Sequence, residues 1–158
     1  MADVTEATAR RDNPDRAFLH DLLSTQARDV PLDMNPVLVS LGATLLVGSG
    51  EALSIRFTAP EYSVQGNGVV SGGTLASMLD LAMALALLAQ LPPGRTCATI
   101  SLTVNMIEPG YVGDFVADAR VKRLGGRVSF VEADLHDATG TRRVATATAP
   151  FAVFDVRA

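Results

Sequence analysis

The sequence has little of what marks several common protein classes. One of its 158 residues is cysteine, Cys97, so an internal disulfide is excluded and a cytoplasmic location is expected. Lysine and arginine number 13 against 17 aspartates and glutamates, and no basic patch stands out, which argues against a nucleic-acid partner. His20 and His136 have no ligand-type neighbours in the sequence, so no metal site is predicted.

The sequence also lacks a segment suited to a membrane. Residues 1–15, MADVTEATARRDNPD, are polar and mixed in charge, without the apolar core of a signal peptide. The most apolar run follows Asp80 and reaches only from Leu81 to Leu91 before a Pro-Pro pair, which is too short to span a bilayer. Because 48% of the residues are apolar and 19% are charged, we expect this run to be a buried helix in one globular domain.

The predicted elements follow the order helix, two strands, long helix, four strands. Residues 1–12 are expected to be a flexible tail, and residues 13–158 a single domain whose first helix is capped by Asn13. Residues 30–38 are predicted to be a connection. The other predicted segments are strands at 41–47 and 52–58, a loop at 59–70, an apolar helix at about 72–90, and strands at 97–107, 114–124, 127–137 and 142–154.

The fold class follows from this order. Consecutive strands joined by short turns, such as the one at Gly125-Gly126, imply an antiparallel sheet and hence an α+β fold. A helix that is apolar on nearly every side must be covered nearly all round, and a curved sheet wrapped around it achieves this. A sheet of this size leaves edges open, so a dimer is expected.

The glycines before the long helix are candidates for a binding site. Ser71 is predicted to cap this helix, which places Gly72 and Gly73 in its first turn. Their amides lack partners within the helix, and a ligand can approach a backbone that has no side chains. Such amides suit an oxyanion that develops on a carbonyl. The alternative is that the glycines only permit a tight turn and close packing.

Asp80 is the one acid inside the long apolar helix, and no cation lies three or four residues away. Such an acid is paired, protonated or functional, so the alternatives to function are a distant arginine partner and a water-filled seam. Gly72 lies eight residues earlier, or about 12 Å along the helix. One carbonyl cannot contact both groups of one chain, which predicts two equivalent sites, each shared across a dimer interface.

Residues 65–80, QGNGVVSGGTLASMLD, resemble the signature of hotdog-fold acyl-CoA thioesterases of the phenylacetate-pathway (PaaI-like) type. That signature reads roughly N-x-x-G-x-x-H-G-G, followed by an acid on the helix. Gly68, Gly72, Gly73 and Asp80 match it. The later segments ATISLTVNMIEPGYVGD and GGRVSFVEADLHDATGTRRVATATAPFAVF resemble the next blocks of the family, so the resemblance covers roughly residues 40–155.

The resemblance implies a sheet wrapped around a helix, assembly into homodimers or tetramers, no cofactor, and hydrolysis of an acyl-CoA to a carboxylic acid and free CoA. It makes Asp80 the general base or nucleophile. It makes Gly72, with Gly73 beside it, the oxyanion-hole amide. Thr99 falls where relatives carry a Ser or Thr that positions the water or the acid.

Two positions depart from the family pattern. Ser71 stands where His is usual, and Gln65 stands where an Asn often helps to hold the water or the carbonyl. Gln65 still offers an amide, Asn67 lies close by, and Ser71 can still cap the helix. These changes leave open an altered choice of substrate and a weakened or lost hydrolysis.

A second substrate-binding region is predicted at the Gly125-Gly126 turn. Arg123 and Arg127 flank it and, with Gly126, are candidates for contacts with CoA phosphates, the alternative being a solvated hairpin tip. Two other functions stay open beside the thioesterase. One is a hotdog hydratase or dehydratase, which the missing motif His disfavours, and the other is a non-catalytic acyl-CoA-binding protein.

Overall fold

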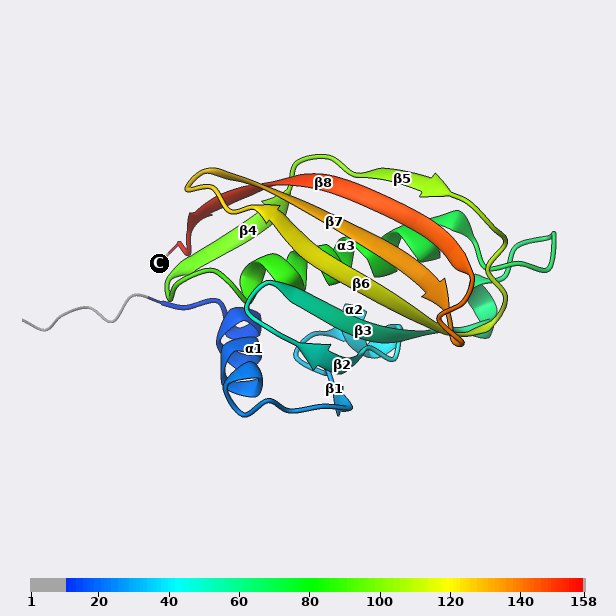
Figure 1. The fold of residues 1–158 in the computed structure, drawn as a ribbon, viewed down its shortest axis with the longest axis horizontal. Coiled ribbons are helices and arrows are strands. Elements are labelled where there is room, and N and C mark those ends of the chain that lie inside the picture. Colours follow the sequence, from blue (N-terminus) through cyan, green and yellow to red (C-terminus); the bar gives the residue numbers. More distant parts are fainter. Residues whose placement is uncertain (1–10, 158) are drawn as a thin grey trace, which may run out of the picture.

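The computed structural model describes residues 11–157 and is an α+β fold in which one antiparallel sheet wraps a long helix (Figure 1). This confirms the predicted fold class. Within these residues the sheet has eight strands in the order β1-β2-β3-β6-β7-β8-β4, with β5 also paired to β8. The elements are α1 (Pro14–Ser24), β1 (Val30–Pro31), α2 (Pro36–Ser40), β2 (Thr44–Gly48), β3 (Ala52–Ala59), η1 (Glu61–Ser63), α3 (Gly72–Leu88), β4 (Arg95–Thr99), β5 (Thr103–Met106), β6 (Gly113–Arg123), β7 (Val128–Asp137) and β8 (Arg143–Asp155).

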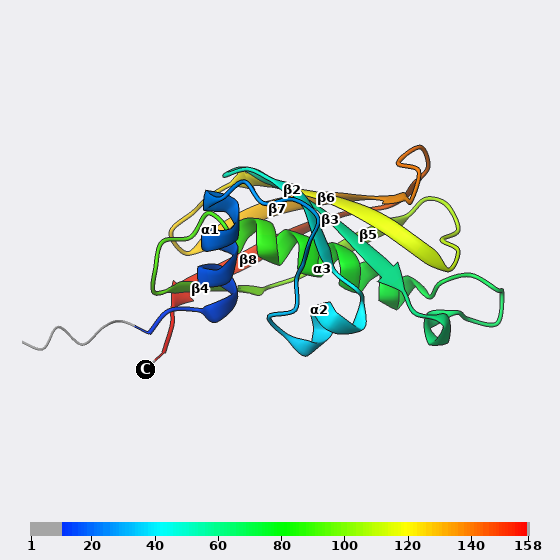
Figure 2. The same cartoon turned by 90° about the horizontal axis from the view of Figure 1, so that it is seen from below.

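Helix α3 lies against the inner face of the sheet, while α1 and α2 flank it (Figure 2). Inward-pointing side chains of the strands, such as Ile55, Phe115 and Phe151, are fully buried beneath it. Among the described helices none is both long and apolar enough to cross a membrane, and α3, the longest, has 17 residues. The apolar character of α3 is explained by its central place in the core.

The sheet does not cover α3 completely. Most of its side chains are buried, including Met78, Leu79, Ala82 and Met83. A stripe at three- and four-residue spacing stays open, in which Gly73 and Ser77 are exposed and Asp80 is half-buried. We call these three residues the open stripe.

Helix α1 is held at the C-terminal end of α3. Asn13 caps α1 by accepting hydrogen bonds from two backbone amides of its first turn. Asp12 accepts hydrogen bonds from the Arg16 guanidinium and, at 2.9 Å, from the Gly94 amide in the turn that follows α3. The tail predicted for residues 1–12 lies outside the described residues except for its last two.

The prediction of a connection at residues 30–38 is wrong, because this segment contains β1 and the start of α2. Asn35 caps α2 by accepting a hydrogen bond from the Leu38 amide at 3.1 Å, and Pro36 is its first residue. The same Asn-Pro start opens α1. Because α2 has only five residues, no apolar periodicity accompanies the capping signal.

The strand predicted at 97–107 is interrupted by a bend between β4 and β5. Before the bend, Cys97 and Thr99 face α3. After it, Leu102 and Val104 pack against the core. The bend therefore shifts the inward positions by one residue. Without this shift Ile100 would face α3 together with Leu102 and Val104, whereas in the structure the Thr99 hydroxyl faces α3.

Candidate active site

Asp80 and Thr99 form the first group of predicted site residues. Asp80 lies on the open stripe of α3, and its Oδ1 accepts a hydrogen bond from the Thr99 hydroxyl of β4 at 2.8 Å. Across residues 11–157, Asp80 takes part in no ion pair, so the alternative of a distant arginine partner is not found there. The hydroxyl orients one carboxylate oxygen and leaves the other free for a water or a substrate.

The N-terminus of α3 carries two backbone amides that have no hydrogen-bond partner within residues 11–157. The side chain of Ser71 caps the helix by accepting a hydrogen bond from the Thr74 amide. The amides of Gly72 and Gly73 donate to no other described residue. A Cβ on Gly72 would lie 3.3 Å from Met106 Cε, whereas a Cβ on Gly73 would have no atom within 4 Å. Close packing therefore explains glycine at position 72 in part and does not explain it at position 73.

A hollow of about 430 Å³ brings Gln65, Asn67 and Gly72 together. The two amide side chains are exposed on the loop between β3 and α3. The apolar wall of the hollow is built by Val69, Val70, Leu75, Met106 and Ile107. An apolar hollow that ends at free amides can hold an acyl chain while its carbonyl oxygen meets those amides.

Glu108 also lines this hollow, which no motif in the sequence indicates. Its carboxylate pairs with the Arg142 guanidinium at 2.8 Å. Arg142 also donates to the Pro109 carbonyl at 3.1 Å and lies over the Tyr111 ring, 5.8 Å from its centroid. Because Glu108 and Arg142 are 34 residues apart, no local pattern could have paired them.

Within one protomer, these residues form two separate groups. Helix α3 is continuous from Gly72 to Leu88, so Gly72 and Asp80 are separated by about 12 Å along its axis. The hollow beside Gly72 is not lined by Asp80 or Thr99. Amide and carboxylate therefore cannot meet on one carbonyl in one chain.

The third group lies at the β6–β7 hairpin. Arg123 and Arg127 are exposed, and Gly126 lines a hollow of about 420 Å³ together with Leu124. The Arg95 guanidinium donates to the Gly126 carbonyl and closes one side of this hollow. The hairpin thus offers cationic and apolar groups next to each other.

Cys97 lies on β4 near Asp80 but is poorly suited to be a nucleophile. Burial, and after it the charge of Asp80, raises the pKa of the Cys97 thiol to about 12. Such a thiol stays protonated near neutral pH, and the thiolate is the reactive form. Cys97 therefore acts as a small packing residue.

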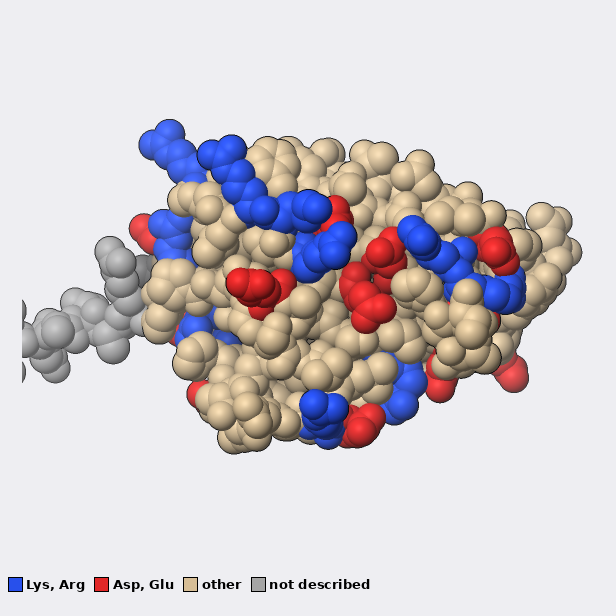
Figure 3. All heavy atoms as spheres, in the orientation of Figure 1, with Lys and Arg blue, Asp and Glu red and all other residues tan. Residues whose placement is uncertain are grey.

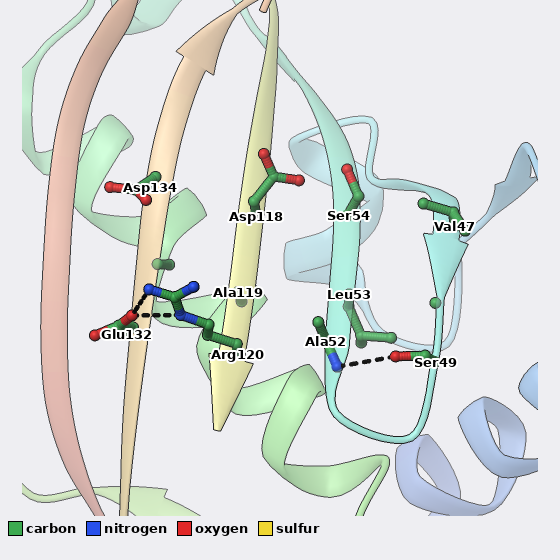
Figure 4. Close-up of a pocket in the computed structure, with 12 residues that line it drawn as sticks. Val47, Ser49, Ala52, Leu53, Ser54, Asp118, Ala119, Arg120, Glu132 and Asp134 are labelled. Carbon is green, nitrogen blue, oxygen red and sulfur yellow. Dashed lines mark hydrogen bonds and ion pairs between the residues drawn. The ribbon is translucent and has the colours of Figure 1, made fainter. Parts of the chain in front are cut away.

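Another hollow, of about 370 Å³, lies on the outer face of the sheet (Figure 4). Arg120 and Glu132 form an ion pair there, and Asp118 faces Asp134 in register between β6 and β7. The sheet separates this hollow from α3, and none of the predicted site residues lines it. The candidate active site is therefore on the inner side.

The sequence matches one known family and several related proteins. The family model described as the thioesterase superfamily matches residues 67–144. A protein of Halobacterium salinarum that carries a provisional esterase name is 39% identical over an alignment of 134 positions, which covers 78% of this chain and 87% of that protein.

Solved structures of related proteins have the same fold. A phenylacetic acid degradation-related protein of Ralstonia eutropha JMP134, provisionally assigned as a thioesterase, is 28% identical with a TM-score of 0.72, covering 85% of this chain and 98% of its own. A Bacillus halodurans protein solved with CoA is also 28% identical, with a TM-score of 0.61, covering 64% of this chain and 66% of its own. The chain therefore belongs to the thioesterase superfamily, a family of acyl-thioester hydrolases, and has the hotdog fold of the phenylacetate-pathway type.

Proposed function

We propose that the protein is an acyl-CoA thioesterase in which Asp80 activates the attacking water or attacks the thioester itself. The observation that carries this proposal is the hydrogen bond from Thr99 to Asp80 on the open stripe of α3. It holds the carboxylate in a fixed orientation while one oxygen stays free. A carboxylate held in this way at the surface of an apolar helix suits a base or a nucleophile.

In the water route, Asp80 accepts a proton from water as the water oxygen forms a bond to the carbonyl carbon. The negative charge that develops on the carbonyl oxygen is stabilised by the Gly72 amide, with Gly73 beside it. The carbon–sulfur bond then breaks, and the leaving thiolate takes the proton from Asp80. In the nucleophilic route, a carboxylate oxygen of Asp80 displaces the thiolate, and water cleaves the resulting anhydride.

The site requires two chains, because Gly72 and Asp80 are too far apart in one. The sheet edge formed by β4 and β5 supports a dimer, since Ile100, Met106 and Ile107 are exposed along it. Pairing this edge with a second copy would cover both the apolar side chains and the open strand. Each site would then combine Asp80 and Thr99 of one protomer with the Gly72 amide of the other.

Substrate binding uses the hollow beside Gly72 and the β6–β7 hairpin. Gln65 and Asn67 orient the carbonyl or the water, and Ser71 keeps the helix start in place. Arg123, Gly126 and Arg127 hold the CoA phosphates. Arg127 lies opposite Val153 of β8, which is in register with Cys97 of β4, two residues before Thr99. The Arg127 backbone is therefore two strand spacings and two residues away from Thr99, or roughly 12 Å. This separation leaves room for a pantetheine arm between the phosphates and the thioester. The CoA-bound relative from Bacillus halodurans supports CoA as the carrier.

A thiol-release screen over short, long and aromatic acyl-CoAs tests the activity and finds the preferred acyl group. On the best substrate, Asp80→Asn should lower kcat by at least ~10³-fold and keep the fold, because it removes the base without changing size. Asp118→Asn, on the outer face, is the matched control and should keep the parent rate. An Asp80→Asn enzyme that turns over like the parent would rule out the mechanism.

Mixing two inactive variants tests the shared site. Gly72→Val should also be inactive, because its side chain blocks the approach to the amide and crowds Met106. After unfolding and refolding together, Asp80→Asn and Gly72→Val chains form heterodimers with one intact site each. Random pairing should restore roughly a quarter of the parent activity. A mixture no more active than its parts would show that each site lies within one chain.

A further inference from the structure

The outer face of the sheet carries an apolar patch that the proposed chemistry does not use. Val128, Phe130 and Phe154 are 38%, 46% and 41% exposed. They alternate along β7 and β8 with buried Ser129 and Val153, so they all point away from α3. Val128 lies in register with Ala152, which is two residues from Phe154 on the same face of β8, and Phe130 is two residues from Val128 on β7. Val128 therefore lies between the two phenylalanines. We call these three residues the hairpin patch.

Basic side chains border the hairpin patch. Arg123 is in register with Phe130, and Arg127 precedes Val128. Neither arginine takes part in an ion pair with another residue of the described chain, and both are exposed. Figure 3 shows Lys and Arg side chains gathered at the hairpin end of this face, whereas acidic and basic side chains mix toward its middle. In a chain of net charge −4, this end is therefore a local excess of positive charge.

The composition of the hairpin patch is that of a protein-binding surface. Exposed aromatic side chains bordered by arginines are enriched where proteins bind one another, and both types often dominate the binding energy. Two arginines suffice for the phosphates of CoA, but CoA leaves Phe130 and Phe154 unexplained. The hairpin patch also adjoins the site, because Val128, Ala152 and Ala98 form one row across β7, β8 and β4, and Ala98 precedes Thr99.

We propose that the hairpin patch docks an acidic carrier protein that bears the acyl group as a phosphopantetheine thioester. This inference rests on the proposed thioesterase function and names a carrier for the same site. The arginines attract the acidic surface of the carrier, and the two phenylalanines bury apolar side chains of the carrier. Arg123 and Arg127 thus bind negatively charged groups of either substrate, which are the phosphates of CoA or the acidic surface of the carrier beside its phosphopantetheine.

The charges favour this occupant over a second copy of the chain. A twofold contact centred on the hairpin patch would gather four arginines, Arg123 and Arg127 of each copy, around one interface, and this concentration of like charge costs free energy. The placement of the aromatic rings also argues against a lipid surface. Phe130 and Phe154 lie on the face of the strands, not at the tip of the hairpin that would enter a bilayer first.

The test compares one acyl group on two carriers. The acyl group preferred in the CoA screen is loaded onto an acidic acyl carrier protein of the dissociated fatty-acid-synthase type, and kcat/KM is measured for both substrates. Phe130→Ser and Phe154→Ser should each lower kcat/KM on the carrier protein by roughly 10-fold and change it less than about 2-fold on CoA. Val47→Ser, an exposed apolar residue of β2, is the matched control and should change neither.

Binding of the carrier protein without an acyl group is measured by calorimetry, which needs no turnover. Binding should weaken as salt rises and in both Phe variants. Equal losses on the two substrates, or no carrier binding at low salt while acyl-CoA is hydrolysed, would overturn the proposal. So would binding to phosphatidylglycerol vesicles in place of the carrier, or a smaller assembly for Phe130→Ser. If neither substrate is hydrolysed, the thioesterase proposal fails, while the binding measurement still decides the docking surface.

Discussion

Two carboxylates of this fold, Asp12 and Asp80, have opposite surroundings. Asp12, at the start of α1, accepts hydrogen bonds from the Arg16 guanidinium and the Gly94 amide, and the bond from Arg16 lowers its pKa to about 2. Asp80, in the middle of α3, accepts one hydrogen bond from Thr99 and meets no cation within residues 11–157.

The difference separates stability from reactivity. The partners of Asp12 stabilise its charged form and join α1 to the turn after α3, so this carboxylate contributes to folding. Asp80 is oriented by one hydroxyl and keeps an oxygen for other partners, so its geometry serves a reaction. The number and charge of the partners, more than burial, distinguish the two acids.

Among changes to the partners of these two acids, the largest effect is expected at Thr99, the partner of Asp80. Thr99→Val keeps the size of the side chain and removes the hydroxyl that orients the carboxylate. We expect kcat to fall by about 10- to 100-fold with a small change in melting temperature. Thr99→Ser keeps a hydroxyl and should stay within a few-fold of the parent. Similar losses in both variants would mean that the methyl group, not the hydroxyl, is what the site needs.

The next effect concerns the partner of Asp12. Asp12→Asn leaves the Arg16 side chain, which is only 6% exposed, without its counter-charge. Denaturant unfolding should show a loss of about 1–3 kcal/mol, and kcat should not change. Asp33→Asn, at an exposed site, should lie within about 0.5 kcal/mol of the parent. A drop in kcat without a loss of stability would erase the distinction between the two acids.

The smallest effect is the acid dependence of the same ion pair. Because folding lowers the pKa of Asp12 from 3.8 to about 2, its stabilising contribution is fully present above about pH 4 and is lost as pH falls toward 2. The stability difference between the parent and Asp12→Asn should therefore shrink by roughly 1–2 kcal/mol over this range. A difference that stays constant between pH 5 and pH 2.5 would contradict the lowered pKa.

Local patterns predicted the elements whose signals lie within one segment. The apolar run and the Ser71 cap predicted α3, and the Gly125-Gly126 turn predicted the β6–β7 hairpin. Asn35-Pro36 carries the same capping signal for α2 as Asn13-Pro14 carries for α1. The bend between β4 and β5 had no such signal, because the alternation of polar and apolar residues continues through it in the sequence.

The candidate site was predictable only in part. The glycines and Asp80 stand out because they break the local pattern, and Thr99 could be named through the family resemblance. Its hydrogen bond to Asp80 depends on the bend that turns Thr99 inward. The pairing of Glu108 with Arg142, and the placement of Val128 between Phe130 and Phe154, depend on strand register between distant segments.

The sequence by itself determined the fold class, the central helix and the separation of Gly72 from Asp80, because helix rise and apolar periodicity act over a few residues. Only the tertiary structure decided which side of α3 stays open, which hydroxyl orients Asp80, and how Asp12 is paired. Those outcomes depend on contacts between segments far apart in the chain, and no pattern within one segment encodes where another segment packs.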